Sequence, residues 1–323
     1  MVRAKWVAVI WGFSGVLMPM SAVQAQTPGG EAAFPSKLVR LVIPFAVGGS
    51  GDASARIVAP FLTERWKQQV IIDPRPGAAT VVGTDIVAKS PPDGHTLMVN
   101  STQFTQSPAL MAKLPYDPVN DLVPITRIMR TPQVIVAHPQ LPVKNIRELV
   151  ALARARPSQL NMANAGNSLP TYYFNILAKV KIETIPYKGA GPMMVDVAGG
   201  HVPLAIGAVS SVQAAVRTGR VSMLGVTSKS VTFPDVPVIS RDVPGFDVDT
   251  WFAMFAPRGT PRELVMRIRD DVAAVLQIAE VRKRLLDIGG EPSGEPVDEF
   301  AAQVRNEIAR WKNVAKTAGI KPQ

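Results

Sequence analysis

Hydrophobic and polar positions follow two periods along this chain, and the alternation between them indicates an α/β protein. Short runs rich in Val, Ile and Phe predict strands, and apolar residues spaced three and four apart predict helices between them. Strands that alternate with helices favour mainly parallel sheets flanked by helices. The predicted strands lie at 39–45, 70–72, 96–99, 134–137, 160–163, 183–186, 204–208, 223–227 and 252–256.

Two helices in the first half of the chain carry clear starting signals. One begins near Asp52 and places apolar residues on a single face as far as Trp66. Asp52 itself has the side chain of an N-cap and favours that role over one as a catalytic acid. The other helix begins with a capping-box pattern formed by Asn145 and Glu148, in which each side chain can bond the backbone N–H of the other.

The chain beyond 256 contains helical patterns and no further predicted strand. One helix starts near Thr260, a second stops at Gly289 and Gly290, and a third carries an apolar stripe from Val297 to Val314. These helices need an earlier sheet to cover. We therefore expect a discontinuous first domain formed by 26–129 plus 248–323, with a second domain at 130–247.

The first twenty-five residues have the layout of a cleavable secretory signal peptide, which we place at 1–25. Arg3 and Lys5 precede an uncharged apolar stretch, and small residues flank Gln24 at the expected cleavage point after Ala25. An uncleaved membrane anchor is the alternative, but the apolar stretch is shorter than the roughly 20 residues that span a bilayer. We expect export to the periplasm.

Charge and composition exclude several functional classes. The net charge is +10, but Lys and Arg are scattered along the chain and no basic run contains interleaved aromatic residues, so we expect no nucleic-acid partner. The chain has no Cys, and its three His residues lack metal-ligand spacing. No nucleophile elbow or acid–base pair is evident. The pattern therefore predicts neither a metal nor a cofactor, and it argues against an enzyme.

The sequence PFAVGGSGD at 44–52 is the most informative local feature, because it lies between a predicted strand and a predicted helix. Closely spaced glycines let the backbone approach a ligand, and the start of a helix offers unpaired N–H donors. Such a turn favours a carboxylate or a phosphate, but it lacks the lysine and the spacing of a P-loop, so the sequence argues against a nucleotide. A tight structural turn without a ligand is the alternative.

Further turns follow other predicted strands. They include RPGA at 75–78, the polar residues at 101–103, NAGNS at 164–168 and KGAG at 188–191. Each is a weak signal alone. Because ligands of α/β proteins bind at the carboxyl ends of strands, several such turns at one edge predict a binding cleft.

Several of these motifs, in this order, resemble the substrate-binding proteins of tripartite tricarboxylate transporters, also called the Bordetella uptake gene family. The resemblance extends over almost the whole chain after 34. The motifs that carry it are PFAVGGSGD at 44–52, RPGA at 75–78, PDGHTL at 92–97, LPYDP at 114–118, PYKG at 186–189 and APRGTP at 256–261.

The resemblance implies a two-domain periplasmic binding protein fold of type II-like organisation, with the ligand cleft between the domains. It implies capture of a small carboxylate by hinge closure and delivery to the membrane permease subunits of a tripartite transporter, by a protein that we expect to be a monomer. A ligand-sensing protein that signals to a membrane sensor kinase stays open as an alternative. A periplasmic enzyme is disfavoured.

Site residues follow from the resemblance position by position. The first loop supplies Phe45, Gly48, Gly49, Ser50 and Asp52. The remaining ligand-binding candidates are Ser101, Thr102, Gly166, Asn167, Thr171, Lys188 and Gly189.

This chain departs from the family pattern at several positions. Leu169 and Tyr172 stand where polar residues are usual, and Gly207 and Ala208 stand where many members carry an acid or another polar residue. We therefore hypothesise a less polar pocket that disfavours an ammonium group. A carboxylate with an apolar or aromatic body should fit better than an amino acid.

Overall fold

The computed structural model describes residues 34–187 and 189–322, together with Met1 and Ala8. The predicted signal peptide and Lys188 therefore lie outside the described residues, apart from Met1 and Ala8. Among the described helices, none has the length and apolar character needed to cross a bilayer.

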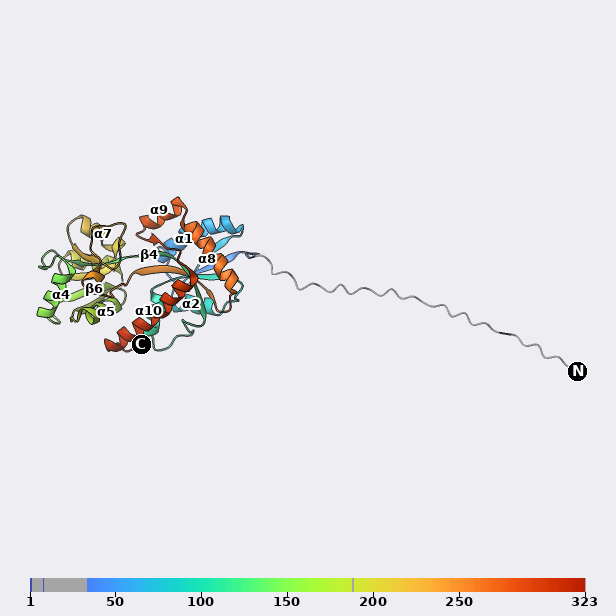
Figure 1. The fold of residues 1–323 in the computed structure, drawn as a ribbon, viewed down its shortest axis with the longest axis horizontal. Helices are drawn as coiled ribbons and strands as arrows, with labels where there is room; N and C mark the ends of the chain where they lie inside the picture. Colours follow the sequence, from blue (N-terminus) through green and yellow to red (C-terminus); the bar gives the residue numbers. More distant parts are fainter. Residues whose placement is uncertain (2–7, 9–33, 188, 323) are drawn as a thin grey trace. The chain divides into compact units, whose positions relative to one another are not determined.

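Two β-sheets organise the chain from Phe34 onward, and each has helices on both faces (Figure 1). Sheet A has the strand order β11–β4–β10–β3–β1–β2 and sheet B the order β7–β6–β8–β5–β9. Sheet A consists of β1 (Val39–Ile43), β2 (Val70–Pro74), β3 (Thr96–Ser101), β4 (Leu122–Thr131), β10 (Thr250–Pro257) and β11 (Glu291–Pro292). Sheet B consists of β5 (Gln133–Ala137), β6 (Asn161–Ala165), β7 (Glu183–Tyr187), β8 (Leu204–Ala208) and β9 (Ser222–Val226).

We call each sheet with its helices a lobe. Lobe A contains sheet A with the turn η1 (Ala78–Thr80) and the helices α1 (Ser50–Trp66), α2 (Val81–Ala88), α3 (Gln103–Leu110), α8 (Arg262–Leu276) and α9 (Ala279–Asp287). Lobe B contains sheet B with the turn η2 (Ile239–Arg241) and the helices α4 (Ile146–Ala155), α5 (Leu169–Ala178), α6 (Ala190–Ala198) and α7 (Val209–Arg217). The blue and orange segments of Figure 1 meet in lobe A, where α1 contacts both α8 and α9.

The α/β class is confirmed, but the prediction of mainly parallel sheets is wrong because both sheets are mixed. The pairs β1–β2, β1–β3, β6–β7 and β6–β8 are parallel, since a helix returns the chain between their strands. β10 runs antiparallel to both β3 and β4, because it re-enters sheet A from lobe B. β5 likewise runs antiparallel to both β8 and β9.

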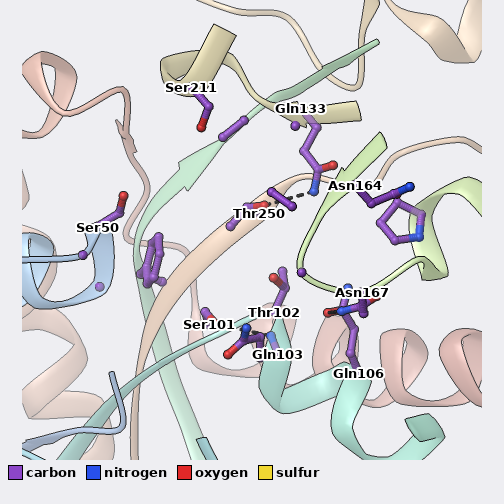
Figure 2. A pocket seen from close by; sticks show the side chains of 18 of the residues that line it. Ser50, Ser101, Thr102, Gln103, Gln106, Gln133, Asn164, Asn167, Ser211 and Thr250 are labelled. Atoms are coloured by element: carbon purple, nitrogen blue, oxygen red, sulfur yellow. Dashed lines mark hydrogen bonds between the residues drawn. The ribbon is translucent and has the colours of Figure 1, made fainter. Parts of the chain in front are cut away.

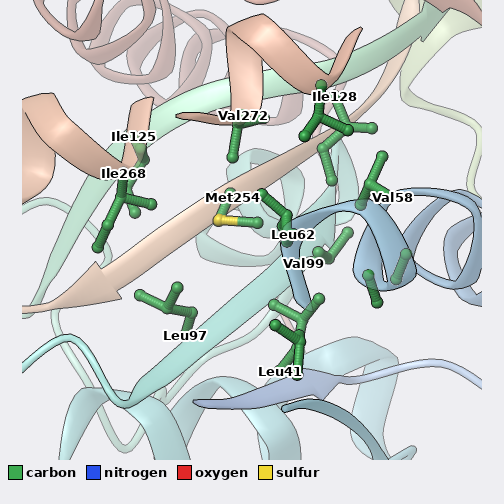
Figure 3. Packing of buried hydrophobic residues seen from close by; sticks show 14 of the residues in the cluster. Leu41, Val58, Leu62, Leu97, Val99, Ile125, Ile128, Met254, Ile268 and Val272 are labelled. Atoms are coloured by element: carbon green, nitrogen blue, oxygen red, sulfur yellow. The ribbon is translucent and has the colours of Figure 1, made fainter. Parts of the chain in front are cut away.

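The strand pattern places alternate side chains of sheet A in two different cores. Leu41, Leu97 and Met254 face the core formed with α1, α8 and α9, which Figure 3 shows from close by. Val42 and Met98, one position further along, face a second core formed with α2, α3 and α10. Burying each such side chain contributes about 1.5–3 kcal/mol. This period of two fixes the register of the sheet.

Helix α10 (Val297–Thr317) packs against both lobes. Phe300 and Val304 enter the second core of lobe A, whereas Trp311 and Val314 enter a core of lobe B. Its buried Glu307 accepts hydrogen bonds that link it to lobe A. The lobe A donors are Thr105 Oγ1 at 3.0 Å and Trp251 Nε1 at 3.1 Å, and Gln303 Nε2 of the same helix donates as well, at 2.8 Å. The predicted apolar stripe of this helix is therefore confirmed, and it serves two cores.

Candidate functional site

A cavity of about 300 Å³ is lined by residues of both lobes. Figure 2 shows ten of its polar side chains around one central space. Lobe A supplies Phe45, Gly49, Ser50, Gly51, Ser101, Thr102, Gln103, Gln106, Thr250 and Phe252, and lobe B supplies Gln133, Asn164, Ala165, Gly166, Asn167, Pro170, Ile206, Gly207, Ala208 and Ser211. This volume is at the lower end of the usual range for ligand pockets and suits a small molecule.

The loop before α1 brings main-chain N–H groups to the cavity wall. Gly49 is the N-cap of α1, and the Ala53 N–H makes the first intrahelical bond to the Gly49 carbonyl at 2.9 Å. The amides of Ser50 and Gly51 precede that bond, so they have no partner within the helix. Gly48 has φ +91°, a conformation that glycine adopts without strain.

Asp52 supports this loop from inside the protein. The prediction that it is the N-cap is wrong, because Gly49 occupies that position and Asp52 lies in the first turn. Its carboxylate accepts from the Gly48 N–H at 3.0 Å and from Arg56 Nε at 2.9 Å. The Arg56 guanidinium beside Asp52 holds the pKa of that carboxyl below its ordinary value. Asp52 is 3% exposed and is absent from the cavity wall.

Two aromatic rings form an apolar part of the wall. Phe45 and Phe252 meet edge to face with their centroids 5.8 Å apart. A Cβ atom on Gly51 would lie only 2.5 Å from Phe45 Cδ2, so only glycine allows α1 to start this close to the rings. Phe252 has two environments. It packs in the lobe A core and also lines the cavity.

The start of α3 brings further polar groups from lobe A. Ser101 ends β3 and Thr102 is the N-cap of α3. Ser101 Oγ accepts a hydrogen bond from the Gln103 N–H at 3.3 Å. Gln103 and Gln106 are on the first turn of the helix, and both line the cavity.

Lobe B contributes the turn between β6 and α5. Gly166 adopts φ +104°, and Asn167 Oδ1 accepts from the Leu169 N–H at 3.0 Å. Asn164 also lines the cavity, and its Oδ1 accepts from Thr171 Oγ1 at 2.8 Å. Thr171 is fully buried, so it orients Asn164 from behind the wall.

The two lobes also meet beside the cavity where the chain crosses between them. Gln133, the first residue of β5, donates from Nε2 to Oγ1 of Thr250, the first residue of β10, at 3.0 Å (Figure 2). Thr227 Oγ1 accepts from the Gln133 N–H at 2.8 Å and donates to Asp249. These bonds tie the crossing segments together at one end of the cavity.

The electrostatic character of the cavity comes from helix ends rather than from ionised side chains. Residues at or near the N-termini of α1, α3, α5 and α7 line it, and each such terminus acts as roughly half a positive charge. The lining residues in the described part of the chain include no Asp, Glu, Lys, Arg or His. An acid group therefore fits this cavity better than a cation does.

The structure brings most of the predicted site residues together. Phe45, Gly49, Ser50, Ser101, Thr102, Gly166 and Asn167 line the cavity. Gly48, Asp52 and Thr171 do not line it, and Gly189 lines an adjoining surface hollow that shares Gln103 and Gly166 with it. Lys188 lies outside the described residues. Contact with a ligand stays a prediction for all of them.

The idea that Leu169 and Tyr172 make the pocket less polar is wrong. Leu169 is fully buried in a core of lobe B, and Tyr172 packs against that core. Both residues lie on α5, and their side chains are on the helix face that packs on the lobe B core rather than in the cavity wall. Gly207 and Ala208 do line it, as that hypothesis required.

The sequence contains no signal for the amide side chains of Gln106 and Gln133, nor for Thr250 and Ser211, whereas Asn164 belongs to the predicted turn at 164–168 although it was not named as a site residue. Gln106 is inside a helix and Gln133 starts a strand, so neither stands in a turn that signals a site. Thr250 comes from a distant part of the chain. The long gaps in sequence between these residues explain why no local pattern revealed them.

Comparison with known proteins shows which family this chain belongs to. The model of the tripartite tricarboxylate transporter family receptor matches residues 54–320, which is most of the chain. The chain belongs to this family. The relatives of this chain include the protein BugT of Bordetella pertussis, which is 32% identical over 95% of this chain and 96% of BugT. The resemblance inferred from the motifs is therefore confirmed.

Two solved structures show the same fold with a small acid. The Rhodopseudomonas palustris protein Rpa4515, solved with adipate, is 34% identical, has a TM-score of 0.72 and covers 90% of this chain and 100% of its own. MatC from the same organism, with bound malate, is 31% identical, has a TM-score of 0.69 and covers 87% and 100%. The periplasmic binding protein BugD is 29% identical, has a TM-score of 0.69 and covers 90% of this chain and 100% of its own, so the fold is that of a periplasmic binding protein.

Proposed function

We propose that this protein is an extracytoplasmic solute-binding protein that captures a small carboxylate between its lobes. The observation that carries the proposal is the cavity between the two sheets, lined by uncharged donors and by residues at helix N-termini. Hydrogen bonds from main-chain amides, hydroxyls and side-chain amides stabilise a carboxylate without a neutralising arginine. The adipate and malate of the two related structures belong to the same chemical class.

The ligand body should be apolar rather than cationic. Phe45, Phe252, Pro170 and Ile206 provide apolar surface in the wall. Gly207 and Ala208 place no carboxylate where an ammonium group could pair, so an amino acid would leave its charge buried without a partner. We expect aliphatic or aromatic acids, dicarboxylates among them, to bind better than aspartate or glutamate.

Binding should work through closure of the two lobes, which we propose are the two domains expected from the sequence. The ligand gains bonds to both lobes only when they close on it, so binding shifts the population toward the closed state. The permease subunits of a tripartite transporter can then distinguish loaded from empty protein. The protein acts in this scheme after export to the periplasm, as a monomer and without catalysis.

A calorimetric series tests this function. Adipate, its neutral diamide and 6-aminohexanoate share one chain length but differ in charge at the ends, and malate, benzoate and glutamate extend the series. We expect micromolar binding of at least one acid without an ammonium group, about −8 kcal/mol, and a raised melting temperature with the same ligand. Tighter binding of glutamate or of the neutral diamide than of every such acid contradicts the proposal.

A further inference from the structure

Gln106 is a buried amide side chain that faces the cavity with one end unused. It is 7% exposed and lies on α3 of lobe A. Its Oε1 accepts from Asn167 Nδ2 of lobe B at 2.8 Å, and Figure 2 shows the two side chains together. Among the described residues, none accepts from Gln106 Nε2. A hydrogen bond from this amide group to a ligand carboxylate would be charge-assisted, so an acid acceptor at this point would be stabilising.

The orientation of the Gln106 amide is fixed by a main-chain group. The Leu169 N–H can only donate, and it donates to Asn167 at 3.0 Å, which identifies the accepting atom as Oδ1. Asn167 must then present its NH₂ group to Gln106. Gln106 in turn must present Oε1 to Asn167 and Nε2 to the cavity. We call this series of bonds, from the Leu169 N–H through Asn167 to Gln106, the relay. The order of donors and acceptors along it follows from hydrogen-bond chemistry.

The relay crosses the cleft. Gln106 belongs to lobe A, whereas Asn167 and Leu169 belong to the segment of lobe B between β6 and α5. When the lobes separate, the bond between the two side chains is lost, and the Gln106 amide is free to turn either end toward the cavity. The relay therefore makes a donor of Gln106 only while the lobes are together.

We propose that Gln106 determines specificity for acids by donating to a carboxylate oxygen, and that Asn167 holds it in that orientation across the cleft. The inference rests on the proposed function and names a residue that recognises the acid. Because Gln106 is held as a donor only in the closed protein, closure would favour a negatively charged ligand over a positively charged one. A ligand with a donor group at this point would face the Nε2 hydrogens and would bind weakly.

Two isosteric variants test the relay. Gln106→Glu keeps an oxygen that accepts from Asn167 but turns a second, negative oxygen toward the ligand. Asn167→Asp keeps an acceptor for the Leu169 N–H but presents a second oxygen to Gln106, which must then rotate and turn its own Oε1 toward the cavity. Gln140→Glu, an exposed position beyond β5, adds the same charge away from the cavity as a matched control.

The probe is whichever of adipate, malate and succinate raises the wild-type melting temperature most, and its diamide is the neutral comparison. At pH 8 we expect Gln106→Glu to weaken acid binding by about 10–100-fold, from a lost charge-assisted bond and added repulsion. Asn167→Asp should weaken it at least tenfold, and Gln140→Glu should leave it unchanged. Binding of the diamide should change much less, so the ratio of acid to diamide affinity should fall in both cleft variants.

A pH profile separates recognition from a merely structural role. Burial and a neighbouring ligand carboxylate raise the pKa of the carboxyl introduced by Gln106→Glu above about 4.3. The acid affinity of this variant, divided by that of wild type at the same pH, should rise as the pH falls from 8 to 5.5, because the protonated carboxyl can donate; the ratio cancels the titration of the ligand's own carboxylates. Melting temperatures without ligand verify that each variant is folded.

The outcomes are distinct. If wild type binds none of these three acids and no other acid of the calorimetric series, the proposed function fails and this inference fails with it. If wild type binds an acid but Gln106→Glu binds it equally well at pH 8, the inference alone is wrong. A loss that is independent of pH and equal for acid and diamide also overturns it, because Gln106 would then only hold the lobes together.

Discussion

Replacing Gly51 with alanine should deform the aromatic part of the cavity wall. The added Cβ would lie 2.5 Å from Phe45 Cδ2, 2.7 Å from Phe45 Cε2 and 2.9 Å from Phe252 Cε1. Unstrained carbon contacts are about 3.5–4.0 Å, so the Phe45 ring must move by about 1 Å or more. Because that ring lines the cavity, its movement away from α1 takes space from the ligand.

Such overpacking costs about 1–3 kcal/mol. In a protein of this size, it should lower the melting temperature by roughly 2–10 °C in a scanning fluorimetry or calorimetry experiment. Acid binding measured by calorimetry should weaken at least tenfold. Gly49→Ala is the matched control for stability, because the nearest atom to its added Cβ is the Ala46 carbonyl oxygen at 3.7 Å and its φ of −79° suits alanine.

The cause can be isolated in a second background. Phe45→Leu removes the ring that the new Cβ would strike, so Gly51→Ala should lose more than half of its destabilising effect when combined with it. An unchanged melting temperature in the single variant would show that the added Cβ does not strain the contact with Phe45. So would an equal loss in both backgrounds, since the contact with Phe45 would not be responsible.

Three further predictions concern the same wall and its support. Asp52→Asn should lower stability at pH 6 and should do so progressively less as the pH falls below 3.8, because the Arg56 partner lowers the carboxyl pKa and its stabilisation is lost as pH falls through that lowered value; denaturant titrations at several pH values check this. Glu307→Leu should cost about 1–3 kcal/mol in urea unfolding, since donors such as Trp251 Nε1 would lose their acceptor; an unchanged midpoint would count against this bonding. Gly49→Val should weaken acid binding at least tenfold by calorimetry with an unchanged circular dichroism spectrum, and wild-type affinity would show that Gly49 does not approach the ligand.

The sequence predicted the elements whose packing follows a clear period, and it failed where distant partners decide the structure. Strand β4 was not predicted because its burial pattern is broken by Arg127 and Arg130. Arg127 pairs with Glu295 and Arg130 pairs with Glu291, and both glutamates lie more than 160 residues further along the chain. They lie in and just after the short strand β11, which follows α9 and was not predicted either. A local pattern cannot reveal such pairs.

The same limit applies to the candidate site. The glycine-rich loop was predictable because glycine has a local conformational meaning, and Gly49 and Ser50 do line the cavity. Gln106 and Gln133 have no local signature, since their place in the wall depends on how the two lobes meet. Leu169 was predicted to face the pocket because its neighbours form a turn at the cavity, but its own side chain is fully buried under α5.

We propose that uncharged donors of the two lobes hold an acid group in this cavity. A crystal structure of the protein saturated with its tightest-binding acid tests that claim most directly. We predict a carboxylate within hydrogen-bond distance of the Ser50 or Gly51 amide and of Gln106 Nε2, with no arginine or lysine bound to it. A carboxylate bound outside the cavity, or paired there with a cationic side chain, would contradict the account.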